Sequence, residues 1–332
     1  MKTFLKVLAL GMSFALTCGA FTSCGDSSSG ETGSDGKVYQ VGIVQQAQHT
    51  ALDSATQGFE DALKEKLGDQ VEVVVQNASG DSANCATIAN QFVSSGKDLI
   101  MTNGSQALQA TVSATEDIPI VATSITDYAT ALNIDLADWT GKTGINVTGT
   151  ADLAPLDQQA DMFEELLPDA QTVGILYCSG EANSKFQVEE VTKALEAKGV
   201  TVNEYSFSDS NDIAAVATKA VGECDALYVP TDNKVADNTS IVNNIAEPAG
   251  VPIIAGEEGI CQGCGIATLS ISYYDIGYMA GEMAYDILVN GKDPADMEIQ
   301  YYEDVEKKYM KDRCEALGIE IPSDYQEIVV EN

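Results

Sequence analysis

Polar side chains that directly follow short apolar runs are the residues of this chain best placed to do chemistry. The apolar run Val41–Val44 leads into the polar run Gln45–His49, and the pattern after it predicts an amphipathic helix from Ala51 to Leu67. A strand, a polar loop and a helix form the unit of an open α/β sheet, and ligands bind where the strands of such a sheet end. The turns after the predicted strands are therefore the candidate binding site.

Twelve residues are candidate ligand contacts, eleven of them in polar turns at predicted strand ends and one at a predicted crossing between two halves of the chain. They are His49, Ser105, Gln106, Thr126, Asp127, Asn183, Ser184, Thr231, Asp232, Asn233, Glu257 and Tyr273. Helices start beside these turns, and their free N–H groups favour an anion or a carboxylate. Taken one at a time, Ser105, Ser184 and Asp232 are equally good helix N-caps.

Catalytic patterns are scarce in the sequence. It contains neither a G-x-S-x-G elbow nor a G-x-x-x-x-G-K-[ST] phosphate loop, and His49 is the single histidine. The adjacent carboxylates Glu257 and Glu258 point to opposite sides of an extended turn. The sequence therefore predicts a binding protein without enzymatic activity and without a cofactor.

The pair Cys261 and Cys264 has the one suggestive cysteine spacing after the N-terminal region. A zinc site needs about four ligands, so two cysteines and one histidine predict no metal. The pair lies in a glycine-rich segment that is interpreted as a turn. A structural disulfide and two free thiols both remain open.

The charge of the chain excludes one class of partner. The net charge is −34, from 51 acidic and 17 basic residues. Nucleic-acid binding requires a cationic surface that displaces counterions, so it is not expected. Such an acidic surface is commonly just solvated. Independently of the charge, we expect a monomer.

A duplication positions the candidate turns. The unit that begins at Val41 returns about 130 residues later as Val173–Leu195, and three further strand–turn pairs repeat at similar offsets. The final polar turns of the two copies are Thr123–Asp127 and Gly256–Gly259. The pattern predicts an α/β protein with two similar Rossmann-like parallel-sheet lobes joined by a hinge.

The lobe boundaries follow from this repeat. The N-terminal lobe is predicted to comprise residues 38–127 plus about 274–296, and the C-terminal lobe about 128–273 plus 297–332. Residues 128–150 interrupt the rhythm and are interpreted as a crossover with an insertion. The last segments are expected to cross back between the lobes and contribute to the hinge.

The N-terminus has the layout of an export signal. Lys2 and Lys6 precede the apolar run Val7–Phe21, which is short for a membrane span. Cys24 follows small residues, as in the bacterial lipobox, whose cysteine is lipidated. Residues 1–23 are thus predicted to be a lipoprotein signal peptide and 24–37 a flexible tether to the outer face of the cell membrane. The alternative is a plain secretory signal with an incidental Cys24.

Several stretches together resemble the bacterial ABC-transporter substrate-binding family of the tryptophan and tyrosine type. They are Val41–Asp53, Ile118–Asp127, Leu166–Tyr177, Glu181–Lys185, Tyr228–Asn233, Val251–Gly259, Tyr273–Leu288 and Leu317–Pro322. The resemblance covers nearly everything after residue 37. It implies the type I fold of periplasmic binding proteins, with the ligand held between two closing lobes and delivered to an ABC permease and its ATPase.

The same resemblance implies an amino acid, first of all an aromatic one, as the ligand. Asp127, Asp232 or Glu257 can then pair with its ammonium through charge-assisted hydrogen bonds. His49 and Tyr273 can flank its ring, although a capping role for His49 and core packing for Tyr273 are alternatives. A sensor for a membrane signalling protein, and a sugar- or nucleoside-binding protein of the same fold, remain open as functions.

Overall fold

The computed structural model describes residues 36–330. Both sheets belong to the compact unit that begins at Val38. The predicted signal peptide, Cys24 and nearly all of the tether lie outside the described residues. None of the described helices is both long and apolar enough to cross a membrane.

The first sheet contains the strands of the N-terminal repeat, all of them parallel, in the order β11-β5-β4-β3-β1-β2. Their bounds are β1 Tyr39–Gln45, β2 Val71–Asn77, β3 Leu99–Asn103, β4 Ile120–Ile125, β5 Val147–Ala151 and β11 Gln300–Tyr301. β3, β4 and β5 are buried along their whole length, as expected of parallel strands covered on both faces. We call this sheet and its helices the first lobe.

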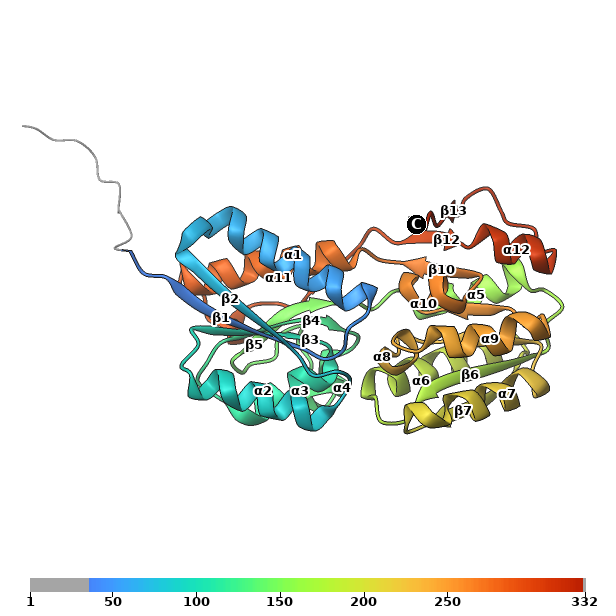
Figure 1. Ribbon diagram of the computed structural model, residues 1–332, viewed down its shortest axis with the longest axis horizontal. Coiled ribbons are helices and arrows are strands. Elements are labelled where there is room, and N and C mark those ends of the chain that lie inside the picture. Colours follow the sequence, from blue (N-terminus) through green and yellow to red (C-terminus); the bar gives the residue numbers. More distant parts are fainter. Residues whose placement is uncertain (1–35, 331–332) are drawn as a thin grey trace, which may run out of the picture. The chain divides into compact units, whose positions relative to one another are not determined.

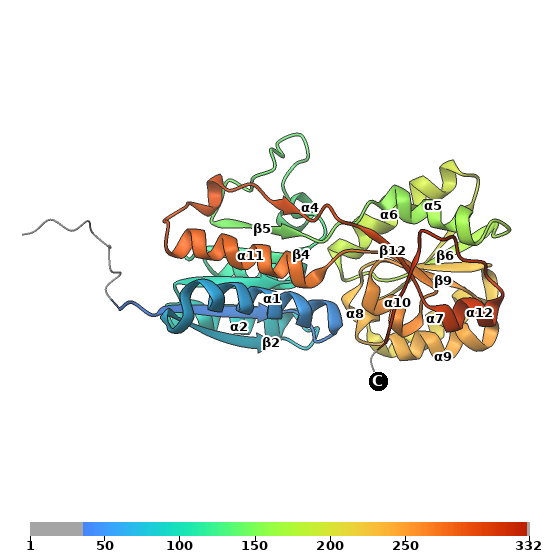
Figure 2. The ribbon, with the colours of Figure 1, turned by 90° about the horizontal axis from the view of Figure 1, so that it is seen from above.

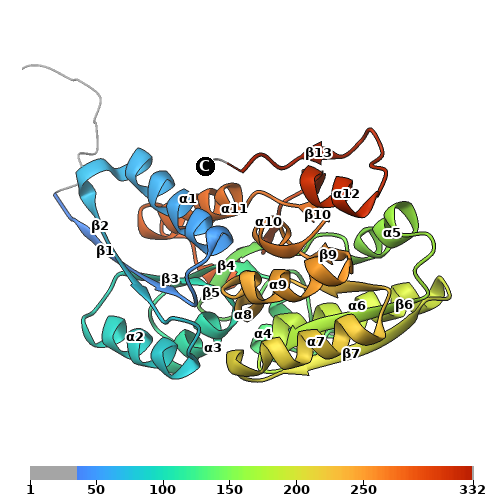
Figure 3. The same cartoon turned by 45° about the vertical axis from the view of Figure 1, so that its right-hand side comes forward.

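Helices cover both faces of the first sheet, with α1 and α11 on one face and α2 and α3 on the other (Figures 1 and 3). Their bounds are α1 Thr50–Leu67, α2 Ser82–Ser94, α3 Ser105–Ala114, α4 Tyr128–Leu132 and α11 Tyr273–Leu288. The apolar side of α1 predicted from the sequence is buried in the structure. Helix α11, from late in the chain, thus completes the lobe that the N-terminal repeat begins.

The second lobe repeats this plan with the sheet order β13-β12-β10-β9-β8-β6-β7. Its strands are β6 Thr172–Cys178, β7 Thr201–Phe207, β8 Ala226–Val229, β9 Ile253–Ala255, β10 Ala267–Ser270, β12 Glu306–Tyr309 and β13 Gln326–Glu327. Only β12 runs antiparallel to its neighbour β10. The order β9-β8-β6-β7 matches β4-β3-β1-β2, which confirms the predicted duplication and the α/β fold.

The helices of the second lobe also form two layers, with α5 and α6 on one face of the sheet and α7 and α9 on the other (Figure 2). The bounds are α5 Leu156–Leu166, α6 Ala182–Ala197, α7 Ile213–Glu223, α8 Asn233–Ala236, α9 Thr239–Ala249, α10 Glu258–Cys264 and α12 Lys311–Leu317. The predicted glycine-rich turn at Cys261 and Cys264 is therefore wrong, because both residues lie on the short helix α10.

The sheets divide the chain at different residues from the predicted lobe boundaries. β5 pairs in parallel with β4, with Ile120 opposite Val147, so the first lobe continues to Ala151 rather than ending at Asp127. β11 pairs with β5 and extends the returning part of this lobe to Tyr301. The sequence analysis did not predict β5, because its buried residues include Thr148, Gly149 and Thr150. They lack the apolar character expected of a buried strand.

Close packing of α1 against α11 joins the beginning of the compact unit to its C-terminal third (Figures 1 and 2). A Cβ added at Gly277 would lie 2.0 Å from the carbonyl oxygen of Ala55, and one at Gly58 would lie 2.0 Å from that of Tyr274. The two backbones approach so closely because these positions carry no side chain. Glycine normally weakens a helix interior, so its presence here reflects contact.

We predict that Gly277→Ala destabilises the protein by about 1–3 kcal/mol or more, because the new methyl group overpacks a backbone contact. Gly222→Ala is the matched control, since Gly222 lies in α7 with no atom near its missing Cβ. This control is expected to gain up to about 1 kcal/mol from helix propensity. Urea unfolding of both variants measures the difference, and equal stabilities would contradict the packing argument.

Candidate ligand-binding site

A small cavity lies where the two lobes face each other. Its volume is about 20 Å³, which is room for one or two water-sized groups. The first lobe and the connections between the lobes contribute His49, Leu52, Ser124, Thr126, Asp152 and Tyr273, and the second lobe contributes Asn183, Thr231, Asp232, Asn233, Ala236, Glu257 and Ile260. Residues more than 200 positions apart in the chain thus line one cavity.

The structure brings eight of the twelve predicted contact residues together in the lining of this cavity. The eight are His49, Thr126, Asn183, Thr231, Asp232, Asn233, Glu257 and Tyr273. They come from turns in both repeats, as the matching of strand ends predicts. Their meeting depends on the lobes facing each other, which the pattern of either repeat alone does not specify.

The other four predicted residues do not line the cavity. Asp127 caps α4 by accepting from the N–H of Thr130 at 2.6 Å, and Ser105 is the buried first residue of α3. Ser184 donates to Asp232 at 2.7 Å. The side chain of Gln106 reaches across to the second lobe and donates to the carbonyl of Gly180 at 3.3 Å.

Ser124 is a lining residue that the sequence analysis did not single out. It has a left-handed backbone with φ of 56°, at a point where the register between β4 and β5 shifts. Its hydroxyl is buried and has no hydrogen-bond partner. A non-glycine residue in this conformation is strained, and such strain is concentrated at functional sites. Ser124 therefore combines a strained backbone with a place in the cavity lining.

Asp152 is the second lining residue missed, because it follows the unrecognised strand β5. Its carboxyl is buried, and the hydroxyl of Tyr273 donates to Oδ2 at 2.9 Å. The other oxygen, Oδ1, has no partner. Burial raises the pKa of Asp152, since a low-dielectric environment disfavours the ionised form. The pair links the two segments that follow β5 and β10, both of which connect the lobes.

Three unpaired buried oxygens therefore surround the cavity: Ser124 Oγ, Asp152 Oδ1 and Asn183 Oδ1. Buried polar atoms are nearly always hydrogen-bonded, and each exception calls for an explanation. The amide oxygen of Asn183 and the oxygens of an ionised Asp152 only accept hydrogen bonds, and a hydroxyl accepts as well. A water-sized group that donates several hydrogen bonds matches this lining in size and in chemistry.

Further carboxylates stand in the wall of the cavity on the second-lobe side. Glu257 caps α10 by accepting from the N–H groups of Gly259 and Ile260, and burial raises its pKa to about 7. Asp232 accepts from the N–H groups of Cys178 and Val235, and burial raises its pKa as well. Neither carboxylate has an ion-pair partner within the described residues.

Among the described residues, four side-chain hydrogen bonds join the two lobes. His49 Nε2 lies 3.1 Å from Asn233 Oδ1, and the hydroxyls of Thr126 and Thr231 lie 3.5 Å apart. Lys234 donates to the carbonyl of Gly80 at 2.6 Å, and the fourth is the contact of Gln106 described above. Burial lowers the pKa of His49, although its bond to Asn233 opposes this, so its imidazole is neutral at pH 7.

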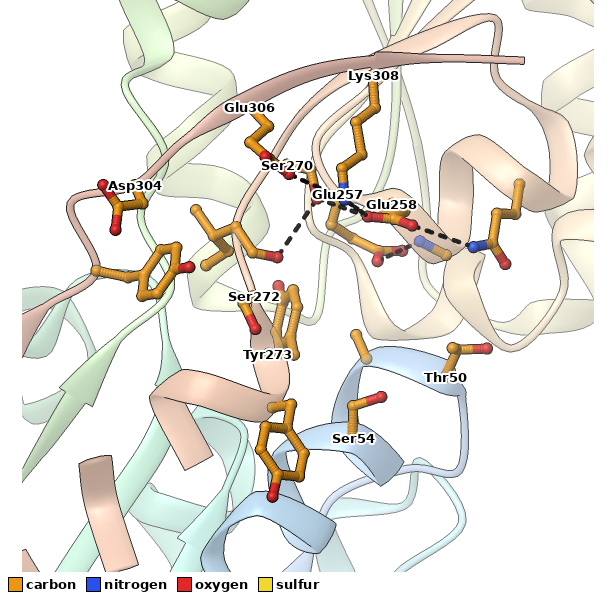
Figure 4. Close-up of a pocket in the computed structure, with 16 residues that line it drawn as sticks. Thr50, Ser54, Glu257, Glu258, Ser270, Ser272, Tyr273, Asp304, Glu306 and Lys308 are labelled. Carbon is orange, nitrogen blue, oxygen red and sulfur yellow. Dashed lines mark hydrogen bonds and ion pairs between the residues drawn. The ribbon is translucent and has the colours of Figure 1, made fainter. Parts of the chain in front are cut away.

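A second cavity of about 220 Å³ adjoins the first and shares Glu257 and Tyr273 with it (Figure 4). In Figure 4, Tyr273 stands between Thr50 and Ser54 of α1 and the start of α10. Glu258 accepts from Lys308 at 2.9 Å and from Ser270 at 2.7 Å. The two cavities together offer a polar pocket and a larger space beside it.

None of the described cysteines lines either cavity. The six cysteines of the described part are free and buried, including Cys261 and Cys264, so the structure contains the two thiols rather than the disulfide. Burial raises the pKa of both thiols. Within residues 36–330, no group of three or more His, Cys, Asp or Glu side chains is arranged to hold a metal ion.

Two parallel-sheet lobes with a polar cavity between them define a binding protein of the periplasmic type. The sequence profile of the family described as ABC transporter substrate binding protein matches residues 40–328. The chain therefore belongs to this family of solute-binding proteins, which are not enzymes. Members of the family that serve importers act outside the cytoplasm with the other transporter components.

Relatives agree with this assignment. The chain is 33% identical to a tyrosine-binding protein of Clostridioides difficile (strain R20291) over 324 residues, 95% of this chain and 93% of the relative. It is 32% identical to the ABC domain of Streptococcus pneumoniae solved in complex with L-Trp, with a TM-score of 0.83, covering 88% of this chain and all of that one.

A third relative is a Clostridium difficile substrate-binding protein with adhesive properties, solved as a ligand-free, open structure. It is 35% identical, covers 89% of this chain and 100% of its own, and has a TM-score of 0.67. Its identity is close to that of the L-Trp complex, yet its TM-score is lower. The present structure therefore matches the ligand complex better than the open structure.

We predict that the free energy of unfolding falls as the pH rises from about 4.5 to 7, in part because of Glu257. Its pKa is about 7 in the folded protein and 4.5 ordinarily, so the folded state retains a proton that the unfolded state releases. The contribution is fully present below about pH 4.5 and is lost as the pH rises through 7, about 3 kcal/mol in all.

Glu257→Gln is expected to reduce this slope by about 1.4 kcal/mol per pH unit, the value for one proton. Glu116→Gln, at an exposed position, is the control and should leave the slope unchanged. Urea unfolding at pH 5, 6 and 7 measures both variants. A Glu257→Gln slope equal to that of the wild type would show that Glu257 ionises normally.

Proposed function

We propose that this protein captures an amino acid, preferably an aromatic one, between its two lobes and delivers it to the ABC permease and ATPase. The observation that carries the proposal is the set of three unpaired oxygens around a cavity of about 20 Å³. An ammonium group is about the size of a water molecule and has three N–H donors. It satisfies these acceptors, and its charge offsets the buried carboxylates.

Asp152 is the proposed partner of the ammonium. Its Oδ2 is held by the hydroxyl of Tyr273, which leaves Oδ1 for the ligand. This differs from the sequence-based assignment to Asp127, Asp232 or Glu257. Asp127 does not line the cavity, and the oxygens of Asp232 and Glu257 already accept backbone N–H groups.

An aromatic side chain is supported by the relatives and by the adjoining space. The printed names of two relatives specify tyrosine and L-Trp. The small cavity has no room for a ring, whereas the neighbouring cavity of about 220 Å³ shares Tyr273 and Glu257 with it. We propose that the ring extends past Tyr273 toward this space, with His49 on the first-lobe side of the site.

The N-terminal segment supports attachment to the membrane. Cys24 follows small residues after an apolar run, and the compact unit begins only at Val38. We propose that lipid on Cys24 anchors a monomeric binding protein to the outer face of the cell membrane. Cys24→Ala should then release the protein from the membrane fraction, and continued membrane association would refute the anchor.

We predict that L-tyrosine and L-tryptophan raise the melting temperature, whereas common sugars and nucleosides do not. A ligand at a hundred times its dissociation constant adds about 2.7 kcal/mol to stability. Asp152→Asn should weaken amino-acid binding by about tenfold or more, because it removes a charge-assisted hydrogen bond. Asp69→Asn, at an exposed position, is the control.

A thermal-shift screen followed by calorimetric titration tests this prediction. Stabilisation by a sugar or nucleoside, with no response to any amino acid, would refute the ligand class while leaving the two-lobe binding protein intact. Equal affinities for wild type and Asp152→Asn would instead refute the assignment of the ammonium to Asp152.

A further inference from the structure

Glu181 is a buried carboxylate that does not line the cavity but contacts residues that do. It is 1% exposed and lies immediately before α6. Its Oε2 accepts from the side-chain amide of Asn233 at 2.7 Å, from the backbone N–H of Asn233 at 3.1 Å and from the side-chain amide of Asn183 at 3.3 Å. Its Oε1 accepts from the N–H of Lys234 at 3.0 Å.

We propose that Glu181 is a positioning residue that fixes which way the amides of Asn233 and Asn183 point in the binding site. An ionised carboxylate only accepts hydrogen bonds, so it takes the NH₂ end of each amide and turns the oxygen end away. The carbonyl of Thr231 reinforces this for Asn183 by accepting from Nδ2 at 2.8 Å. For Asn233, Glu181 is the carboxylate that sets the orientation.

The orientation of the Asn233 side-chain amide determines which ring nitrogen of His49, in the other lobe, carries the proton. Asn233 Oδ1 is an acceptor and lies 3.1 Å from His49 Nε2, so His49 carries its proton on Nε2. Both the neutral Nε2–H tautomer and the imidazolium donate from this atom. The bond between the lobes therefore persists whichever of these two forms His49 adopts.

The orientation of Asn183 determines what the cavity recognises. Its Oδ1 is unpaired and joins Asp152 Oδ1 and Ser124 Oγ in the lining. This part of the inference rests on the proposed function, because it concerns the preference for an ammonium. If the side-chain amide of Asn183 were flipped, its NH₂ group would face the N–H donors of the ligand. The cavity would then lose one acceptor.

The first test is NMR of the imidazole, which gives one unambiguous signal because His49 is the single histidine. At pH 8 and without ligand, ¹⁵N chemical shifts should show the Nε2–H tautomer in the wild type. Glu181→Gln keeps one carbonyl oxygen and should keep this tautomer. Glu181→Met has a similar length but no acceptor, and it should shift part of the population to Nδ1–H.

Asp225→Asn is the matched control, since Asp225 also accepts two backbone N–H groups in the second lobe, those of Gln171 and Thr172. It should leave the tautomer of His49 unchanged. An Nδ1–H tautomer in the wild type would overturn the inference without any variant. So would an unchanged Nε2–H tautomer in folded Glu181→Met.

The second test compares the affinities for L-tyrosine and for 3-(4-hydroxyphenyl)propanoate, which lacks the amino group. Glu181→Met should reduce the preference for L-tyrosine by about tenfold, the equivalent of one hydrogen bond to a charged group. Glu181→Gln should retain most of the wild-type preference. An equal loss for both compounds would refute the effect on recognition. If the wild type binds neither compound, the proposed ligand is refuted. The tautomer of His49 still tests the positioning role of Glu181 in that case.

Discussion

Buried carboxylates without cationic partners are the constraint around which the binding site is built. Asp152, Glu181, Asp232 and Glu257 are each 6% exposed or less, and burial raises the pKa of every one of them. The protein stabilises three of them with backbone N–H groups at the starts of helices. Lys234, two residues after Asp232, donates instead to the carbonyl of Gly80 in the other lobe. In the proposed function, the ammonium group of the ligand supplies the positive charge that offsets these carboxylates.

This constraint explains the geometry of the connections between the lobes. Tyr273 begins α11, and its hydroxyl holds one oxygen of Asp152 directly after β5. The close contact of α11 with α1, which depends on Gly58 and Gly277, fixes where Tyr273 stands. The packing of the first lobe therefore positions a hydrogen bond in the site.

The polar network of the second lobe works in a complementary way. Glu181 and Asp232 accept the N–H groups of the segment Asn233–Val235, so α8 begins at a defined place and orientation. That segment carries Asn233, the residue that meets His49 of the first lobe. His49 and Asn233, which form a hydrogen bond between the lobes, thus also line the cavity.

The sequence by itself determined the duplication, the parallel-sheet lobes and eight of the lining residues, because buried strands and polar strand ends leave a local pattern. It did not reveal β5, whose Thr148 and Thr150 are buried polar residues, and so it missed Asp152. It missed Ser124 because the irregularity at this residue arises from the pairing between β4 and β5. Which carboxylate oxygen is left unpaired was decided only by the tertiary structure, because hydrogen-bond partners such as Tyr273 and Asp152 lie more than a hundred residues apart.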